Sequence, residues 1–153
     1  MDGKIQSTGG VIIPTEVVEK SNEIKQQHRS LRQTQVYRDI SNLKYLIVKI
    51  MGDTPRRYAK YIDEVVMTVS NAKQSIALGM RVSNLEVRRD NLDFASAMIE
   101  DLQDDAVILH KLDIIDKRRK KEIKKLAQKV AGQTVRLRDY FKSQGIAGDV
   151  NSY

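Results

Sequence analysis

The sequence contains no cysteine and no tryptophan, and it has only two prolines among its 153 residues. The lack of cysteine excludes disulfide bonds, thiolate metal sites and cysteine nucleophiles. The stretch 85–131 contains neither proline nor glycine, which favours long helices. No apolar run approaches the length of a membrane span, and the N-terminus lacks the basic and apolar regions of a signal peptide. These absences predict a soluble, cytoplasmic, all-helical protein that does not contact a membrane.

The residue patterns of an active site are absent as well. The two histidines, His28 and His110, are far apart in the sequence, and no Glu is followed three residues later by His. The di-iron motif of helical bundles is therefore missing, as are Gly-rich phosphate loops, nucleophile elbows and the His-Glu-x-x-His motif. Carboxylates four residues apart do occur, as in Asp101 and Asp105, but no histidine accompanies them. We expect a non-enzymatic protein without cofactor or metal.

Apolar residues recur at alternating spacings of three and four along four successive segments. The segments predict helices at about 36–51, 55–80, 85–112 and 116–143, with Gly52-Asp53-Thr54-Pro55 as the first stop signal. The expected core positions are Ile40, Leu43, Ile47 and Ile50; Tyr58, Ile62, Val65, Val69, Ala72 and Ile76; Leu92, Ala95, Ile99, Leu102, Ala106 and Leu109; and Ile123, Leu126, Val130, Leu137 and Tyr140. Gln133 occupies an expected apolar position of the last segment. This pattern predicts an all-α, antiparallel up-down four-helix bundle.

The two ends of the chain lack this pattern. Residues 1–14 are glycine-rich and irregular, and residues 15–35 have only sparse apolar positions. We expect residues 1–35 to form a polar N-terminal arm, partly disordered or helical. Residues 36–144 are then the four-helix bundle, and residues 145–153 a frayed tail.

Positive charge is concentrated toward the C-terminus. Residues 1–35 carry five basic and four acidic side chains, and residues 36–113 carry eleven and twelve. Residues 114–153 carry eleven and four, so the last forty residues supply the whole net charge of +7. A rigid surface of one sign is a plausible footprint for a polyanion such as RNA or DNA.

Most cations of the fourth predicted helix spread over its outward half at about 100° per residue. Like charges four residues apart weaken an isolated helix by about 0.2–0.5 kcal/mol per pair. We therefore expect negative charge from elsewhere to compensate this repulsion. Three interpretations remain open: a phosphate backbone, pairing with the acidic third helix within or between subunits, and a merely solvated face. The candidate nucleic-acid-binding residues are Lys117, Arg118, Lys120, Lys121, Lys124, Lys125, Lys129, Arg136 and Arg138, together with Arg56 and Arg57 at the start of the second helix.

Two other basic pairs also allow two interpretations. The stretch Arg56-Arg57-Tyr58-Ala59-Lys60-Tyr61 interleaves cations with aromatic rings, a mixture that can bind phosphates and stack bases. The alternative is that Tyr58 belongs to the core and the arginines are simply exposed in the first turn. Arg88-Arg89, before the third helix, presents the same choice.

A short first helix followed by Asp53-Thr54-Pro55-Arg56-Arg57-Tyr58 is similar to a Pro-Arg-x-x-x-Tyr helix start, with a shortened spacing. Arg89 with Leu92 opens the third helix, and the basic fourth helix ends in Tyr140-Phe141, where a Trp is common in the group concerned. With these motifs, residues 36–144 resemble the four-helix-bundle accessory variability proteins of diversity-generating retroelements. That group is related to the bundle proteins encoded in intervening sequences of bacterial 23S ribosomal RNA.

The resemblance implies a homopentameric barrel with a basic surface. Such a barrel would bind a reverse transcriptase and its template RNA, and it would help to prime mutagenic cDNA synthesis. The expected function is therefore that of a non-enzymatic accessory protein that binds RNA or DNA through its fourth helix. The alternative is a homo-oligomeric interaction module, in which the basic helix pairs with an acidic helix of a partner.

Overall fold

A computed structural model of the chain describes residues 5–8, 11–14 and 35–152. Contacts divide the chain into two compact units, Met1–Thr34 and Gln35–Tyr153. In the first unit, strand β1 (Ile5–Thr8) pairs antiparallel with β2 (Val11–Pro14), and Thr8 lies opposite Val11. The sequence predicts irregular structure here, so the two strands correct that prediction. Residues 15–34 of the predicted arm lie outside the described residues.

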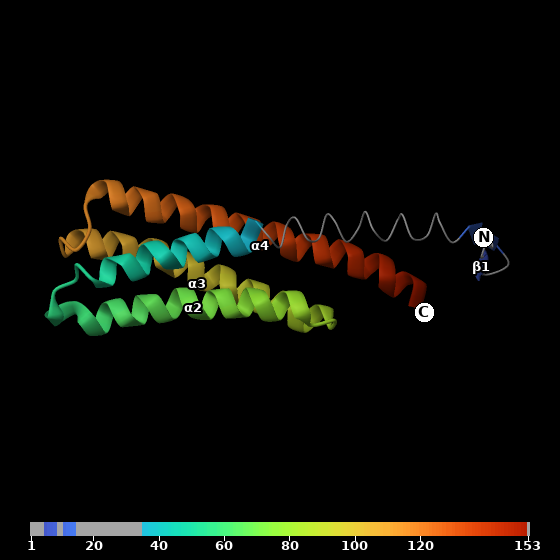
Figure 1. Cartoon of the computed structure of the whole chain (residues 1–153). Helices are drawn as coiled ribbons and strands as arrows, with labels where there is room; N and C mark the ends of the chain where they lie inside the picture. The colour runs from blue at the N-terminus through green and yellow to red at the C-terminus, as the bar shows by residue number, and fades with distance from the viewer. Residues whose placement is uncertain (1–4, 9–10, 15–34, 153) are drawn as a thin grey trace. The chain divides into compact units, whose positions relative to one another are not determined.

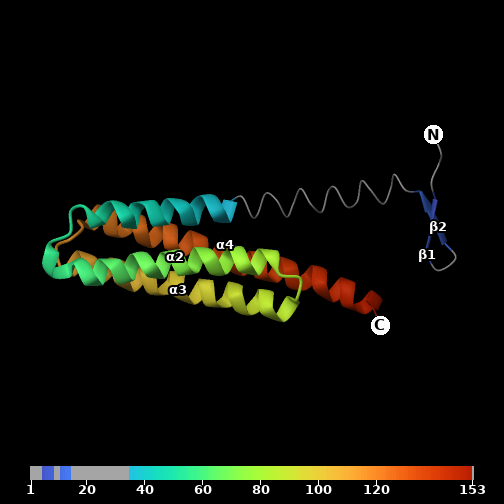
Figure 2. The ribbon, with the colours of Figure 1, turned by 60° about the horizontal axis from the view of Figure 1, so that its bottom comes forward.

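The second unit is a bundle of four helices. The first helix covers residues 35–51, and a short 3-10 helix η1 (Arg56–Tyr58) leads into α2 (Ala59–Arg81). The others are α3 (Leu85–Lys111) and α4 (Lys117–Ser152). Figures 1 and 2 show the helices side by side, with the turns before η1 and before α4 at one end and the α2–α3 turn at the other. The predicted antiparallel up-down four-helix bundle is confirmed.

The predicted helix ends agree with the structure to within a few residues, except at the end of α4. Helical backbone continues there to Ser152, whereas the sequence predicted an end near residue 143 and a frayed tail from residue 145. Within the part of the chain that the structure describes, none of the helices combines the length and the apolar character needed to cross a lipid bilayer.

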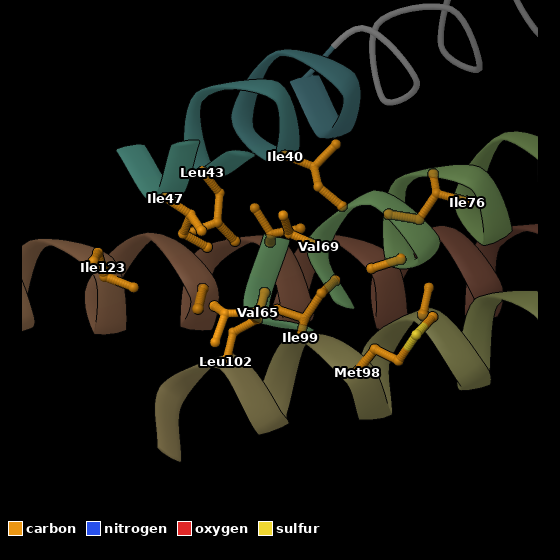
Figure 3. Close-up of a cluster of buried hydrophobic side chains, with 14 of the residues drawn as sticks. Ile40, Leu43, Ile47, Val65, Val69, Ile76, Met98, Ile99, Leu102 and Ile123 are labelled. Atoms are coloured by element: carbon orange, nitrogen blue, oxygen red, sulfur yellow. The ribbon is translucent and has the colours of Figure 1, made fainter. Parts of the chain in front are cut away.

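Side chains from all four helices meet in one core (Figure 3). Ile40 of the first helix, Val69 of α2, Ile99 of α3 and Ile123 of α4 are all fully buried. The residues predicted to line the core are buried throughout the first helix and α3, and in α2 with the exception of the half-buried Tyr58. Burial of each large apolar side chain contributes about 1.5–3 kcal/mol, so this shared core holds the basic helix in place.

The core-facing line of α4 differs from the prediction. Its buried residues are Ile123, Ala127, Val130, Thr134, Leu137 and Phe141, whereas Leu126 and Tyr140 are only partly buried. Thr134, and not Gln133, fills the position between Val130 and Leu137. Its hydroxyl donates a hydrogen bond to the Val130 carbonyl at 2.8 Å, so this polar residue is buried with its donor satisfied.

The turn between α3 and α4 determines where the basic helix begins. Asp113 adopts a left-handed conformation with φ of 59°, and the Ile114 amide donates to the Leu109 carbonyl at 3.0 Å. This geometry is a Schellman ending of α3. Asp116 then caps α4, because its Oδ1 accepts a hydrogen bond from the Arg119 amide at 2.7 Å. A carboxylate here is favourable at the positive end of the helix dipole, which the following cations oppose.

Candidate nucleic-acid interface

Most of the predicted cations of α4 have no ion-pair partner among the residues that the structure describes. This group consists of Lys117, Arg118, Lys120, Lys121, Lys124, Lys125 and Arg136, of which Lys120 and Lys124 are partly buried and the rest exposed. The basic run does contain one ion pair, between Arg119 and Glu122, with a nitrogen–oxygen distance of 3.2 Å. Within the described residues, α4 itself therefore supplies carboxylate partners to Arg119 and Arg138 but not to these seven cations.

Two of the predicted residues are engaged with neighbouring helices. Arg138 Nη1 lies 2.6 Å from Asp93 Oδ1 of α3, and Nη2 lies 3.1 Å from Asp139. Hydrogen bonds to these carboxylates raise the pKa of Arg138 above its ordinary value. Lys129 Nζ lies 3.3 Å from Asp39 Oδ2 of the first helix. Both cations help to join α4 to its neighbours, so they are less available to an external phosphate than the unpaired group.

Asp39 is the buried end of the contact between the first helix and α4. Its carboxylate accepts a hydrogen bond from Gln133 Nε2 at 2.7 Å in addition to the Lys129 contact. Burial raises the pKa of Asp39, but hydrogen bonds from Gln133 and Lys129 and the charges of Lys129 and Arg38 outweigh that effect and lower it overall. Asp39 therefore stays ionised at neutral pH and holds Lys129 against the first helix.

Arg56 and Arg57 are exposed in η1, at the same end of the bundle as the start of α4 (Figures 1 and 2). A pocket of about 180 Å³ at this end is lined by both turns, with Asp53 from one and Asp116 from the other, and by Arg119 of α4. The Arg57 guanidinium lies 4.9 Å from the centre of the Tyr58 ring. Tyr58 is half-buried and already in contact with a cation, so it is a poor platform for a base.

The Arg88-Arg89 pair divides into a structural and an exposed residue. Arg88 is buried, and its Nε donates to the Gly79 carbonyl at 2.9 Å while Nη2 donates to the Val82 carbonyl. Its guanidinium lies 4.0 Å from the centre of the Phe141 ring, so it joins the α2–α3 turn to α4. Arg88 is therefore engaged within the fold, whereas Arg89 is exposed. Both line a pocket of about 300 Å³ together with Phe141.

An exposed aromatic ring that the sequence analysis did not single out lies beside the basic helix. Tyr45, on the first helix, is 65% exposed. It lines a groove of about 490 Å³ between the first helix and α4, together with Leu46, Leu126 and Lys125. Lys49 Nζ lies 6.0 Å from the centre of its ring. The available signal was an aromatic residue outside the apolar core line and close to lysines.

An acidic cluster lies between α2 and α3, whereas the basic groove lies between the first helix and α4. The cluster comprises Glu64, Asp101, Asp104 and Asp105, grouped around Tyr61, whose hydroxyl donates to Asp105 at 2.8 Å. Burial, followed by the nearby carboxylates, raises the pKa of Asp105, although the Tyr61 hydrogen bond acts in the opposite direction. Among the described residues, no three metal-ligating side chains are arranged to hold a metal ion.

Comparison of the chain with protein-family models, with curated proteins and with solved structures gave no match. The function must therefore be argued from the residues themselves. Two features bear on it: the α4 cations that have no ion-pair partner within the described part of the chain, and an exposed aromatic ring in the groove alongside.

Proposed function

We propose that the protein binds nucleic acid through the basic surface of α4 and acts without catalysis of its own. The observation that carries this proposal is the set of α4 cations with no carboxylate partner in the described part of the chain. Phosphates of RNA or DNA would supply the missing charge, and each contact would release condensed counterions. Because phosphate contacts are largely sequence-independent, specificity would come from nucleic-acid shape or from a protein partner.

A finer role rests on the resemblance of residues 36–144 to accessory variability proteins. On that basis we propose that the chain assists a reverse transcriptase in mutagenic cDNA synthesis in the cytoplasm, as a homo-oligomer that is a pentamer in the resembling group. A reverse-transcriptase gene with paired variable and template repeats next to the gene for this chain would support the role. A gene neighbourhood with neither would contradict it and leave general nucleic-acid binding in place.

Reversal of Lys121, Lys124 and Lys125 to Glu tests the interface directly. We expect this triple variant to lose binding to a structured RNA in fluorescence anisotropy at low salt, with its helical circular dichroism unchanged. For the unchanged protein, log affinity should fall linearly with log salt, with a slope of about −0.7 to −0.9 for each phosphate neutralised. Normal RNA binding by the variant would show that the α4 surface is not the site.

A matched control reverses three cations of α2, namely Lys60, Lys73 and Arg81, to Glu. This variant changes the net charge by the same amount as the α4 variant but leaves the α4 surface intact. It should bind RNA more weakly than the unchanged protein only through the long-range field, and far more tightly than the α4 variant. Equal losses in the two variants would mean that net charge alone, and no particular surface, governs binding.

The alternative function is a homo-oligomeric interaction module. The observation that favours it is the acidic cluster, because Glu64, Asp101 and Asp104 have no ion-pair partner among the described residues and could receive α4 of another copy. In that case rising salt would dissociate the oligomer. In the proposed function, salt would remove nucleic acid and leave an assembly with an apolar interface intact. Light scattering of nuclease-treated protein at low and high salt distinguishes the two.

A further inference from the structure

Tyr45 is unusual among the tyrosines of the bundle because its ring is open to solvent. Of the others, Tyr37 packs against the core, Tyr58 lies beneath the Arg57 guanidinium, Tyr61 donates its hydroxyl to Asp105, and Tyr140 packs edge-on against a neighbouring ring. Aromatic rings contribute most to stability when their large apolar area is buried. An exposed ring at 65% contributes little to the fold and is accessible to a ligand; what distinguishes Tyr45 from the similarly exposed Phe94 is its place in a groove beside the basic helix.

The groove beside Tyr45 combines an aromatic ring with apolar side chains and with cations. Its apolar residues are Leu46 and Leu126. From α4 it is lined by Lys125, by Lys129, which is paired with Asp39, and by Glu122. Both views of the ribbon show the first helix running alongside α4 (Figures 1 and 2). Lys49 adds a third cation next to the ring. An aromatic platform within a positively charged groove is the arrangement by which proteins bind single-stranded nucleic acid without reading its sequence.

We infer that the groove between the first helix and α4 holds an unpaired nucleobase stacked on Tyr45, with flanking phosphates on Lys49 and Lys125. This inference rests on the proposed function and adds the substrate class, which is single-stranded or looped nucleic acid. A regular duplex keeps its bases stacked inside the helix, so it presents phosphates to α4 but no free base to Tyr45. Single strands and duplexes would therefore use overlapping cations but differ in their dependence on Tyr45.

A Tyr45→Trp variant makes the stacking directly visible, because the chain has no tryptophan of its own. We expect a single-stranded oligouridylate to quench the fluorescence of the new indole. An RNA duplex at the same phosphate concentration should leave it nearly unchanged. The matched control is Phe94→Trp, since Phe94 is a similarly exposed aromatic residue, at 58%, on α3 and outside the groove. Its fluorescence should respond to neither probe.

Affinity gives a second, independent readout. Tyr45→Ala should weaken binding of the oligouridylate by about 5- to 150-fold, the loss that follows from one missing base–aromatic stack. Tyr45→Phe should bind like the unchanged protein because it keeps the ring. Duplex affinity should be the same for all three proteins, since their α4 cations are intact.

The outcomes separate this inference from the proposed function. Base stacking on Tyr45 is contradicted if Tyr45→Ala binds the oligouridylate as tightly as the unchanged protein, or if Tyr45→Trp and Phe94→Trp respond alike. Phosphate binding by α4 would remain in either case. If the unchanged protein binds neither the single strand nor the duplex at low salt, the proposed function fails and this inference fails with it.

Discussion

Asp39 shows how one buried side chain limits which cations of α4 are available. It is 4% exposed and lies against Lys129 and Gln133, so it joins the first helix to the middle of α4. The side-chain amide of Gln133 has its hydrogen bond from Nε2 to Asp39, whereas its Oε1 is buried and has no hydrogen-bond partner among the described residues. Loss of the carboxylate would leave both polar ends of that amide unsatisfied, which is costly in a buried position.

We therefore expect Asp39→Ala to lower the free energy of unfolding by about 1–3 kcal/mol. Urea denaturation followed by circular dichroism measures the change. The double variant Asp39→Leu, Gln133→Leu should lose less, because replacing both partners by apolar side chains strands no polar group. A double variant less stable than Asp39→Ala would show that apolar packing, and not the hydrogen bond, decides stability at this position.

Asp39 also makes the free energy of unfolding depend on pH, and the direction of that dependence follows from its lowered pKa. The pKa of Asp39 is lowered in the folded protein, so between the folded and unfolded pKa values the unfolded chain binds more protons. The stabilisation by ionised Asp39 is therefore complete above its unfolded pKa, near 3.9, and is lost as the pH falls through the folded pKa. The stability difference between the unchanged protein and Asp39→Ala should shrink over that acidic interval. A constant difference would contradict the lowered pKa.

At the scale of elements, the turn between α3 and α4 carries a residue in an unfavourable conformation. Asp113 has a positive φ of 59°, where glycine is the residue that fits without strain, and its charge lies at the negative end of the α3 dipole. Asp113→Gly should therefore raise the free energy of unfolding by up to about 1 kcal/mol and the melting temperature by a few degrees. Differential scanning calorimetry measures both.

Asp113→Ala serves as the control for that prediction. Alanine removes the charge but keeps the strain of a side chain at positive φ, so this variant should be less stable than Asp113→Gly. Equal melting temperatures for the two variants would show that charge, and not backbone conformation, sets the cost at this turn.

The elements themselves could be predicted because each is encoded locally. In the first three helices the apolar line is regular, and the residues predicted for the core are buried with the exception of Tyr58. In α4 the prediction assigned Gln133 to the apolar position between Val130 and Leu137, whereas Thr134 is the buried residue there. Thr134 lies on the same buried line as Val130 and Leu137, and the hydrogen bond from its hydroxyl to its own helix satisfies its polar group there. The strands β1 and β2 were missed because four residues are too few to show a period.

The candidate site could be predicted only in part, for a related reason. The run of cations is local and visible in the sequence, whereas the partners of Lys129 and Arg138 come from other helices. Which cations are unpaired is therefore a property of the folded bundle. The same holds for Tyr45, since only the packing of the first helix against α4 turns an isolated tyrosine into the edge of a basic groove.

At the scale of the whole molecule, the two signs of charge are separated. The acidic cluster Glu64, Asp101 and Asp104 lies between α2 and α3, and the unpaired cations lie on α4. Arg138 and Asp93 form the one ion pair that joins α3 to α4 among the described residues. This separation allows a polyanion to bind at α4, and it equally allows α4 to bind the acidic cluster of a second copy. Reversing the charge of the acidic cluster distinguishes the two functions.

We expect the variant Glu64→Lys, Asp101→Lys, Asp104→Lys to keep its oligomeric state and to bind RNA at least as tightly as the unchanged protein. The reason is that it leaves α4 intact and raises the net charge above +7, which strengthens the long-range attraction of a polyanion. Fluorescence anisotropy measures the affinity, and sedimentation velocity on nuclease-treated protein measures the oligomeric state.

The interaction module requires the opposite result, because two basic surfaces would then face each other between copies. The acidic-cluster variant should fall to monomers in that case, and adding Lys121→Glu, Lys124→Glu and Lys125→Glu to it should restore the oligomer by exchanging the two signs. Restored assembly in the exchanged variant would establish pairing between copies as the function of α4. If the exchanged variant instead keeps the oligomer throughout and loses only RNA, the cations of α4 act on phosphates and the bundle assembles through other surfaces.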